Sequence, residues 1–252
     1  MTGAAVPYLS SLGWAALAVF AGGVVKGIAA LGLPLVAIPL ATLAVGLKHA
    51  VALLVMPMFG ANLVQSFQGG MFRRSARQFR VLAPTVFLFV LLGTRILVSV
   101  PQRSLELVIG AALIVLPILI RLRPNFVLRE RQRRWSDPLA GAVSGLLGGI
   151  SAYYGPPLML YVMGLRLPKV EFVSGISLLY WIAGLGLMIG VYVFGAADLP
   201  LLGWSLAMLV PAWAGMWLGR RVQVRLSETA FSRVLMVVYL VTGVIFLVEA
   251  LA

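Results

Sequence analysis

Long runs of apolar residues, separated by short polar or glycine-containing stretches, make up most of the chain. The runs lie at about 9–30, 33–46, 49–69, 78–99, 104–121, 139–153, 156–165, 170–195, 199–219 and 230–251. A helix needs roughly 20 apolar residues to cross the hydrocarbon core of a bilayer, and most of the runs are about that long. The runs at 33–46, 139–153 and 156–165 are shorter, which predicts helices that enter the membrane without crossing it.

The same spacing of glycine and proline residues occurs twice, about half a chain apart. It runs from Gly22 to Pro34 (GGVVKGIAALGLP) and from Gly145 to Pro157 (GLLGGISAYYGPP), and in each copy a glycine is followed ten positions later by Gly-x-Pro. Glycine and proline weaken helices, and a freed backbone group in hydrocarbon costs several kcal/mol unless protein or water satisfies it. Two matched interruptions therefore predict discontinuous helices around a protected site, as in secondary transporters.

Basic side chains concentrate in three loops, and cytoplasmic loops of membrane proteins carry an excess of Lys and Arg. The loops contain Arg73, Arg74, Arg77 and Arg80; Arg121, Arg123, Arg129, Arg131, Arg133 and Arg134; and Arg220, Arg221 and Arg225. Simple alternation of full spans cannot place all three loops on one side of the membrane. They share a side if each glycine–proline stretch forms a hairpin that returns to the side from which it entered.

We therefore predict an all-α integral membrane protein built from two inverted repeats. Each repeat is a broken-helix or re-entrant hairpin followed by three transmembrane helices, and a simple count gives about seven to eight spans. The predicted domains are a first membrane repeat at 1–122, a basic cytoplasmic linker at 123–137 and a second membrane repeat at 138–252. In this topology Lys48 and Arg103 lie on the outer side of the membrane, so they are exceptions to the excess of basic residues in cytoplasmic loops.

Composition excludes several other classes. The chain has 252 residues, of which 62% are hydrophobic and 11% charged, against roughly 25% charged residues in soluble domains. The formal net charge of +13 comes from arginines in short loops, which topology and anionic lipid headgroups explain better than nucleic acid does. With no cysteine and the single histidine His49, no metal centre and no cofactor are expected.

The acidic residues offer no catalytic constellation. They are Glu106, Glu130, Asp137, Glu171, Asp198, Glu228 and Glu249. Most of them flank the apolar runs, so we expect no carboxylate pair inside the membrane for acid–base catalysis or for a sodium site. No catalytic residue is assigned, and a membrane enzyme is the weaker class.

The glycine–proline turns predict an anion site. A helix that begins at such a turn directs the positive end of its dipole and its first N–H groups at whatever lies ahead, and glycine lets a ligand approach the backbone closely. The candidate substrate-binding residues of the two turns are Gly32, Leu33, Pro34, Gly155, Pro156 and Pro157. The alternative is that the glycines serve only close helix packing, which we favour for Gly22, Gly23, Gly145 and Gly149.

Lys26 is a further candidate for substrate binding. It lies some seventeen residues into the first apolar run, and an intramembrane cation is functional by default. We predict that it faces the anion cavity as a counter-charge. The alternative is that its ammonium snorkels to the surface along the four-carbon stem. Arg95 lies near the outer end of its run, where snorkelling is the better explanation.

Uncharged polar residues follow the two hairpins in corresponding order. Asn62 and Gln65 share a helical face in the first half, and Ser174, Ser177 and Tyr180 form a similar stripe in the second. Hydrogen bonds between helices would explain each residue singly. The paired placement makes Asn62 and Ser177 candidates for opposite walls of one cavity.

These motifs also carry a family resemblance. In the first half the residues are Phe20–Gly23, Gly27 and Gly32–Pro39, and the second half echoes them with Gly145–Gly149 and Gly155–Pro157. With its duplicated halves and charged central loop, nearly the whole chain resembles the sulfite exporter TauE/SafE family of bacterial membrane proteins. The resemblance implies a multi-span carrier or exporter of small anions such as sulfite or organosulfonates.

Two features depart from the commoner family pattern, namely Lys26 between the first-half glycines and Tyr153-Tyr154 before the Gly-Pro-Pro. We expect a multi-pass protein of the bacterial inner membrane that exports a small oxyanion or organosulfonate, with the bilayer and that anion as partners and no nucleic acid. A homo-oligomer is compatible with the sequence. The alternatives are an importer or bidirectional carrier of another small oxyanion or carboxylate, and a membrane enzyme or accessory subunit.

Overall fold

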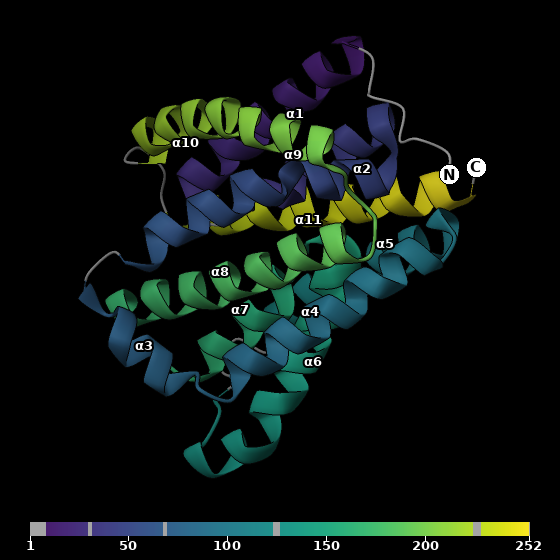
Figure 1. Ribbon diagram of the computed structural model, residues 1–252. Helices are drawn as coiled ribbons and strands as arrows, with labels where there is room; N and C mark the ends of the chain where they lie inside the picture. Colours follow the sequence, from purple (N-terminus) through teal and green to yellow (C-terminus); the bar gives the residue numbers. More distant parts are fainter. Residues whose placement is uncertain (1–8, 30–31, 68–69, 123–126, 224–227, 252) are drawn as a thin grey trace.

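The computed structural model describes residues 9–29, 32–67, 70–122, 127–223 and 228–251, and in these ranges the chain forms helices and no strands (Figure 1). The helices are α1 (Leu9–Ala29), α2 (Leu33–Ser66), α3 (Phe72–Gln78), α4 (Leu82–Ser99), α5 (Gln102–Leu122), α6 (Arg133–Ser151), α7 (Gly155–Gly164), α8 (Lys169–Val193), α9 (Leu199–Ala207), α10 (Leu209–Gln223) and α11 (Glu228–Leu251), with a 3-10 turn, η2 (Glu130–Gln132), before α6. Their bounds follow the predicted apolar runs closely. Arg123 and Arg225 of the predicted basic loops lie outside the described residues.

Six stretches among the described residues are long and apolar enough to cross a membrane. They are Ser11–Ile28, Leu33–Ser66, Leu82–Ser99, Gln102–Leu119, Val170–Val193 and Leu199–Arg221, and Tyr239–Leu251 is a shorter apolar helix. The helices α6 and α7 do not qualify, as the short runs at 139–153 and 156–165 predicted. The chain is therefore an all-α membrane protein that crosses the bilayer several times.

The helix α2 contains two predicted elements and reverses direction between them. It has 34 residues, which at 1.5 Å per residue would extend about 51 Å, far more than the roughly 30 Å of a hydrocarbon core. Gly46 has φ 76° and ψ 159°, which breaks the helix at the predicted boundary. Before the break, α2 runs back along α1, where the Trp14 indole donates to the Leu40 carbonyl at 2.6 Å. After it, the chain returns until Asn62 meets Lys26.

A second hairpin consists of α6 and α7. The helix α6 ends at Ser151, where Ala152 has φ 61°, and the ten-residue α7 then begins at Gly155. At the end of α7, the Gly164 carbonyl accepts a hydrogen bond from the N–H of Leu128, which precedes α6, at 2.7 Å. The chain therefore leaves this hairpin at the end where it entered, as the sequence predicted.

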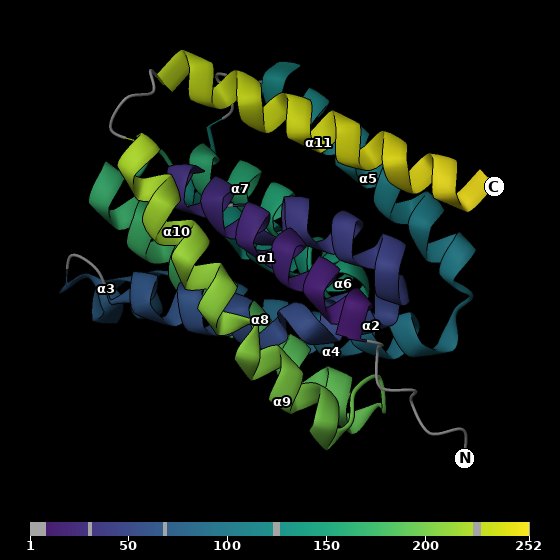
Figure 2. The same ribbon diagram turned by 90° about the horizontal axis from the view of Figure 1, so that it is seen from above.

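Glycines allow the first helix of each hairpin to pack against a helix of the other half. The closest pairs are α1 with α10 and α4 with α6, and Figure 2 shows α1 beside α10 and α11 beside α5. A Cβ on Gly23 would lie 2.5 Å from the Ala212 carbonyl oxygen, and one on Gly149 would lie 2.6 Å from the Gly93 Cα. Packing is thus a sufficient role for these two glycines. The reciprocal pairing is the pattern that inverted repeats predict, and the repeat symmetry itself stays a prediction.

The close approach of α4 and α6 predicts that alanine is tolerated worse at Gly149 than at a glycine with open space around it. Gly149→Ala places a methyl group against the α4 backbone, so we expect it to destabilise the protein by about 1–3 kcal/mol. Gly203→Ala in α9 meets no atom within 4 Å and gains helix propensity, so its stability should equal or exceed the wild type. Thermal unfolding of both purified variants in the same detergent measures the difference, and equal melting temperatures would contradict the packing argument.

Candidate functional site

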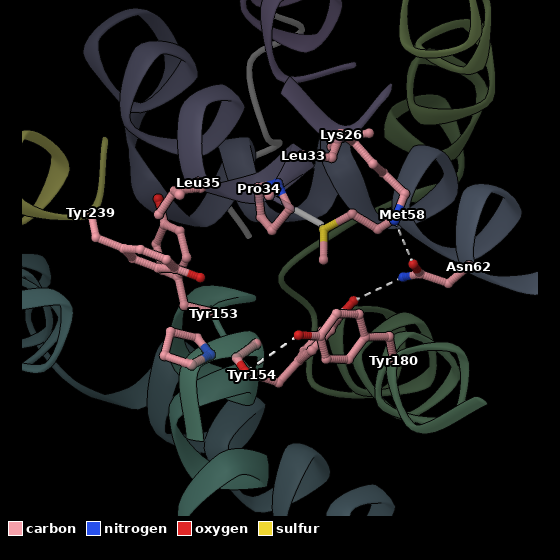
Figure 3. Close-up of a pocket in the computed structure, with 13 residues that line it drawn as sticks. Lys26, Leu33, Pro34, Leu35, Met58, Asn62, Tyr153, Tyr154, Tyr180 and Tyr239 are labelled. Carbon is pink, nitrogen blue, oxygen red and sulfur yellow. Dashed lines mark hydrogen bonds between the residues drawn. The ribbon is translucent and has the colours of Figure 1, made fainter. Parts of the chain in front are cut away.

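The two glycine–proline turns meet at one small cavity (Figure 3). Seven of its thirteen lining residues were predicted from the sequence, namely Lys26, Gly32, Leu33, Pro34, Asn62, Gly155 and Pro156. The cavity volume is about 30 Å³, and since a water molecule needs roughly 10–15 Å³ by this measure, the space is enough for about two waters. The structure thus brings together segments that are more than a hundred residues apart. The role of these residues in binding stays a prediction.

Two predicted site residues do not line the cavity. Pro157 is buried in the first turn of α7, and it points elsewhere because successive helix positions are rotated by about 100°. Ser177 is buried on α8 and is not among the residues that line the cavity. Tyr180, one turn further along α8, has a longer side chain and lines the cavity in its place.

The ammonium of Lys26 lies inside the protein. The side chain is 4% exposed, and its Nζ donates to the Asn62 Oδ1 at 2.8 Å and to the Gln65 Oε1 at 3.4 Å. The snorkelling alternative is therefore wrong for Lys26. By contrast, Arg95 is exposed, as expected for a side chain that snorkels to the surface, and its guanidinium carbon lies 5.6 Å from the centre of the Phe194 ring.

The first turn depends on glycine for its backbone conformation. Gly32 precedes α2 with φ 97° and ψ 8°, a left-handed conformation that residues with a Cβ rarely adopt. A Cβ there would come no closer than 3.4 Å to its nearest neighbour, the Val25 Cγ1, so space alone does not require glycine. The positive φ, rather than helix packing, explains this residue.

The helix ends offer fewer backbone donors than the sequence suggested. Pro34, Pro156 and Pro157 carry no N–H, and the N–H of Leu35 donates to the Gly32 carbonyl at 3.0 Å. The positive ends of the two helix dipoles remain at the cavity. Most of the remaining hydrogen-bonding capacity must therefore come from side chains.

Four tyrosines supply that capacity, and of these only Tyr180 was named from the sequence in a stripe expected at the cavity, without being chosen as a candidate. They are Tyr153, Tyr154, Tyr180 and Tyr239. The Tyr154 hydroxyl accepts from the Asn62 Nδ2 at 3.4 Å, and the Tyr180 hydroxyl donates to the Gly155 carbonyl at 3.3 Å. The pair Tyr153-Tyr154 directly before Gly-Pro-Pro was a usable signal. Tyr239, in the last apolar run, carried none.

Tyr153 differs from the two hydrogen-bonded tyrosines. It is 2% exposed, and its hydroxyl has no hydrogen-bond partner in the part of the chain that the structure describes. Its ring packs edge-on against Phe246 with centroids 6.1 Å apart. In Figure 3, Tyr153 and Tyr239 lie on one side of the cavity, while Lys26 and Asn62 lie on the other.

The acidic residues do not belong to the described lining of the cavity, which suits a site for anions. However, Glu106 is 4% exposed and lies close enough to Glu249 to interact with it electrostatically, and the Oε2 of Glu249 is buried without a hydrogen-bond partner in the described chain. Both residues lie near the ends of their helices, as expected, but α5 and α11 pack on each other and bring the two carboxylates near each other there.

A second pocket lies where two of the basic loops meet. Its volume is about 660 Å³, and its lining includes Arg74, Arg80, Arg133 and Arg134. Arg74 pairs with Glu171 at 3.0 Å, so the start of α8 belongs to the same region. Loops 73–80 and 129–134 therefore lie on one side of the molecule.

Comparison with known proteins gives one match. A family model described as Sulfite exporter TauE/SafE matches residues 15–246, which include most of α1, the rest of both hairpins and the whole cavity lining. No curated protein and no solved structure matches the chain.

Proposed function

The chain belongs to the sulfite exporter TauE/SafE family, and on that premise we propose that it exports a small sulfur-containing anion, sulfite or an organosulfonate. The substrate site is the cavity between the two hairpins. The observation that carries the proposal is the convergence of Lys26 and both glycine–proline turns on that cavity. A buried cation, two positive helix ends and several hydroxyl donors together favour a bound anion.

The proposed topology is that of two inverted repeats with the basic loops in the cytoplasm of a bacterium. In this arrangement α1 and the first part of α2 enter from outside, and α6 and α7 enter from the cytoplasm. The hydrogen bond between Leu128 and Gly164 supports the return of the second hairpin to its own side. Each hairpin then brings one helix N-terminus to the site, and rocking of one half against the other would expose it alternately.

The proposed direction follows from the membrane potential. An inside-negative potential assists outward movement of an anion by about 2.3 kcal/mol per charge per 100 mV. Export would therefore need no coupling ion. Reconstituted flux of sulfite, compared with thiosulfate, sulfoacetate and acetate, tests the proposal. Uptake of acetate alone, with no sulfur-containing anion carried, would contradict it.

We predict that Lys26 supplies part of the attraction for the anion. Lys26→Met keeps most of the apolar stem but removes the ammonium, and should weaken substrate binding by about 1–3 kcal/mol. Lys26→Arg should retain more binding than the methionine variant but less than wild type, because the planar guanidinium has a different shape.

The matched control is Lys48→Met. Lys48 is another lysine in a helix, and its Nζ donates to the Val98 carbonyl at 3.1 Å, away from the cavity. Binding isotherms for sulfite with the purified variants provide the measurement. A folded Lys26→Met protein that binds as wild type does would exclude the counter-charge role.

The topology gives a separate prediction, because the chain has no cysteine and each introduced one is unique. Ala76→Cys and Glu130→Cys, at exposed positions of the basic loops, should react with a membrane-impermeant maleimide only from the cytoplasmic side. Ser104→Cys, exposed at the start of α5, should react only from outside. Labelling of Ala76→Cys from outside intact cells would rule out the proposed orientation.

A further inference from the structure

The pocket lined by arginines is separate from the cavity between the hairpins, and the two share no described lining residue. Its volume of about 660 Å³ is within the range of roughly 300–1,000 Å³ that is usual for small-molecule sites. Five arginines and three acidic residues belong to its described lining. They come from the region of α3 in the first half of the chain and from the starts of α6 and α8 in the second.

The acidic residues of this pocket already have arginine partners. Glu171 pairs with Arg74 at 3.0 Å. The Arg133 guanidinium reaches Glu130 at 3.3 Å and Asp137 at 3.5 Å. Two of the five arginines are therefore paired with the three acids, and the positive charge of the described lining stays in excess.

The other three arginines of the lining, Arg77, Arg80 and Arg134, are exposed and form no salt bridge with a described residue. The guanidinium carbon of Arg134 lies 5.5 Å from the centre of the Trp135 ring. That contact uses the flat face of the guanidinium, so the N–H groups at its edge can still bind a ligand. An anion is the ligand that this group of side chains favours.

Arginine geometry narrows the class of anion. A guanidinium presents its N–H donors in a planar fork that matches two oxygens of a carboxylate or a phosphate. A carboxylate has two oxygens and one charge, whereas a terminal phosphate has three acceptor oxygens and up to two charges at neutral pH. Several guanidinium groups around one pocket therefore fit a phosphate better than a carboxylate.

Contacts between helices hold the walls of the pocket in place. Arg133, in the first turn of α6, donates to the carbonyl of Gln78 at the end of α3. The Ser75 hydroxyl donates to the Ser174 Oγ at 3.1 Å and so connects α3 with α8. A site whose walls are already fixed loses less conformational freedom when a ligand binds.

We propose that this pocket binds a phosphate-bearing anion, which is held by Arg77 and Arg80 beside α3 and by Arg134 on α6. The bound phosphate connects the first half of the chain with the second. A phospholipid headgroup and a soluble phosphate compound both carry this group, and Arg80 lies directly before the membrane-spanning stretch Leu82–Ser99. The site is independent of which anion the chain transports.

The experiment uses the full-length protein and has two arms, one for each source of the phosphate. In the first arm, protein in nanodiscs of neutral phosphatidylcholine is titrated calorimetrically with inorganic pyrophosphate. In the second arm, protein is extracted from vesicles of phosphatidylcholine and phosphatidylglycerol, and native mass spectrometry measures the phosphatidylglycerol that it retains. Binding in the first arm identifies a soluble phosphate compound, and selective retention in the second identifies a lipid headgroup. Binding in neither arm would overturn the proposal.

Arg77→Gln and Arg134→Gln each remove one guanidinium from the pocket, so each should weaken binding by about tenfold in the arm that shows it. Arg77→Lys keeps the charge but loses the planar fork and should also bind more weakly than wild type. The matched controls are Arg73→Gln and Arg131→Gln, which remove exposed arginines from the same two loops outside the described lining. The controls should bind as wild type does.

Melting temperatures without ligand establish that the variants are folded, and they should equal that of wild type, because Arg77 and Arg134 form no salt bridge with a described residue. An equal loss of binding in the controls would indicate a general attraction to basic loops and would overturn the pocket as a site. Loss in Arg77→Gln alone, with Arg134→Gln binding as wild type does, would overturn the connection between the two halves. Sulfite flux tests the proposed function separately, and its absence leaves this site unaffected.

Discussion

Unpaired backbone groups are tolerated inside a membrane only where protein encloses them, and that constraint underlies the arrangement of this chain. Each hairpin contains a helix that starts within the bundle, at Leu33 or Gly155. Neither start can face lipid. The close packing of α1 on α10 and of α4 on α6, made possible by glycines such as Gly23 and Gly149, surrounds both with protein. The cavity is the place where the two enclosed helix starts meet.

The chemistry of the cavity depends more on side chains than on the helix ends themselves. Prolines provide the turn geometry but remove N–H groups from the first turns, so the positive dipole ends contribute charge and few donors. Lys26 and the tyrosine hydroxyls compensate for the missing donors. Asn62 links the two sets, because it accepts from Lys26 and donates to Tyr154. This linkage connects the first half of the chain with the second across the site.

Much of the fold could be predicted from the sequence. The lengths of the apolar runs predict the helices, and the positions of glycine and proline predict where these helices are interrupted. The break at Gly46 coincides with the end of the predicted run at 33–46, and the family resemblance is confirmed over residues 15–246. Lys26 was identifiable because a charge within an apolar run is rare.

Contacts between distant segments were not predictable in the same way. Tyr239 belongs to the last helix and reaches a cavity formed by α1, α2 and α7, and a tyrosine in an apolar run resembles any interfacial tyrosine. Glu106 stands near the start of its apolar run, where solvent exposure is the usual expectation, but packing of α5 on α11 buries it. In both cases the deciding factor is which helix lies alongside, and a single sequence does not contain that information.

The central claim is that an anion binds between the two hairpin turns, and an experimentally determined structure of the protein in lipid nanodiscs with saturating methanesulfonate tests it most directly. The account predicts sulfonate oxygens within hydrogen-bonding distance of the Lys26 Nζ and next to the turns at Gly32 and Gly155, which line the same cavity from opposite halves of the chain. Ligand density only in the arginine-lined pocket around Arg74 and Arg133, with the cavity between the turns unoccupied, would contradict it.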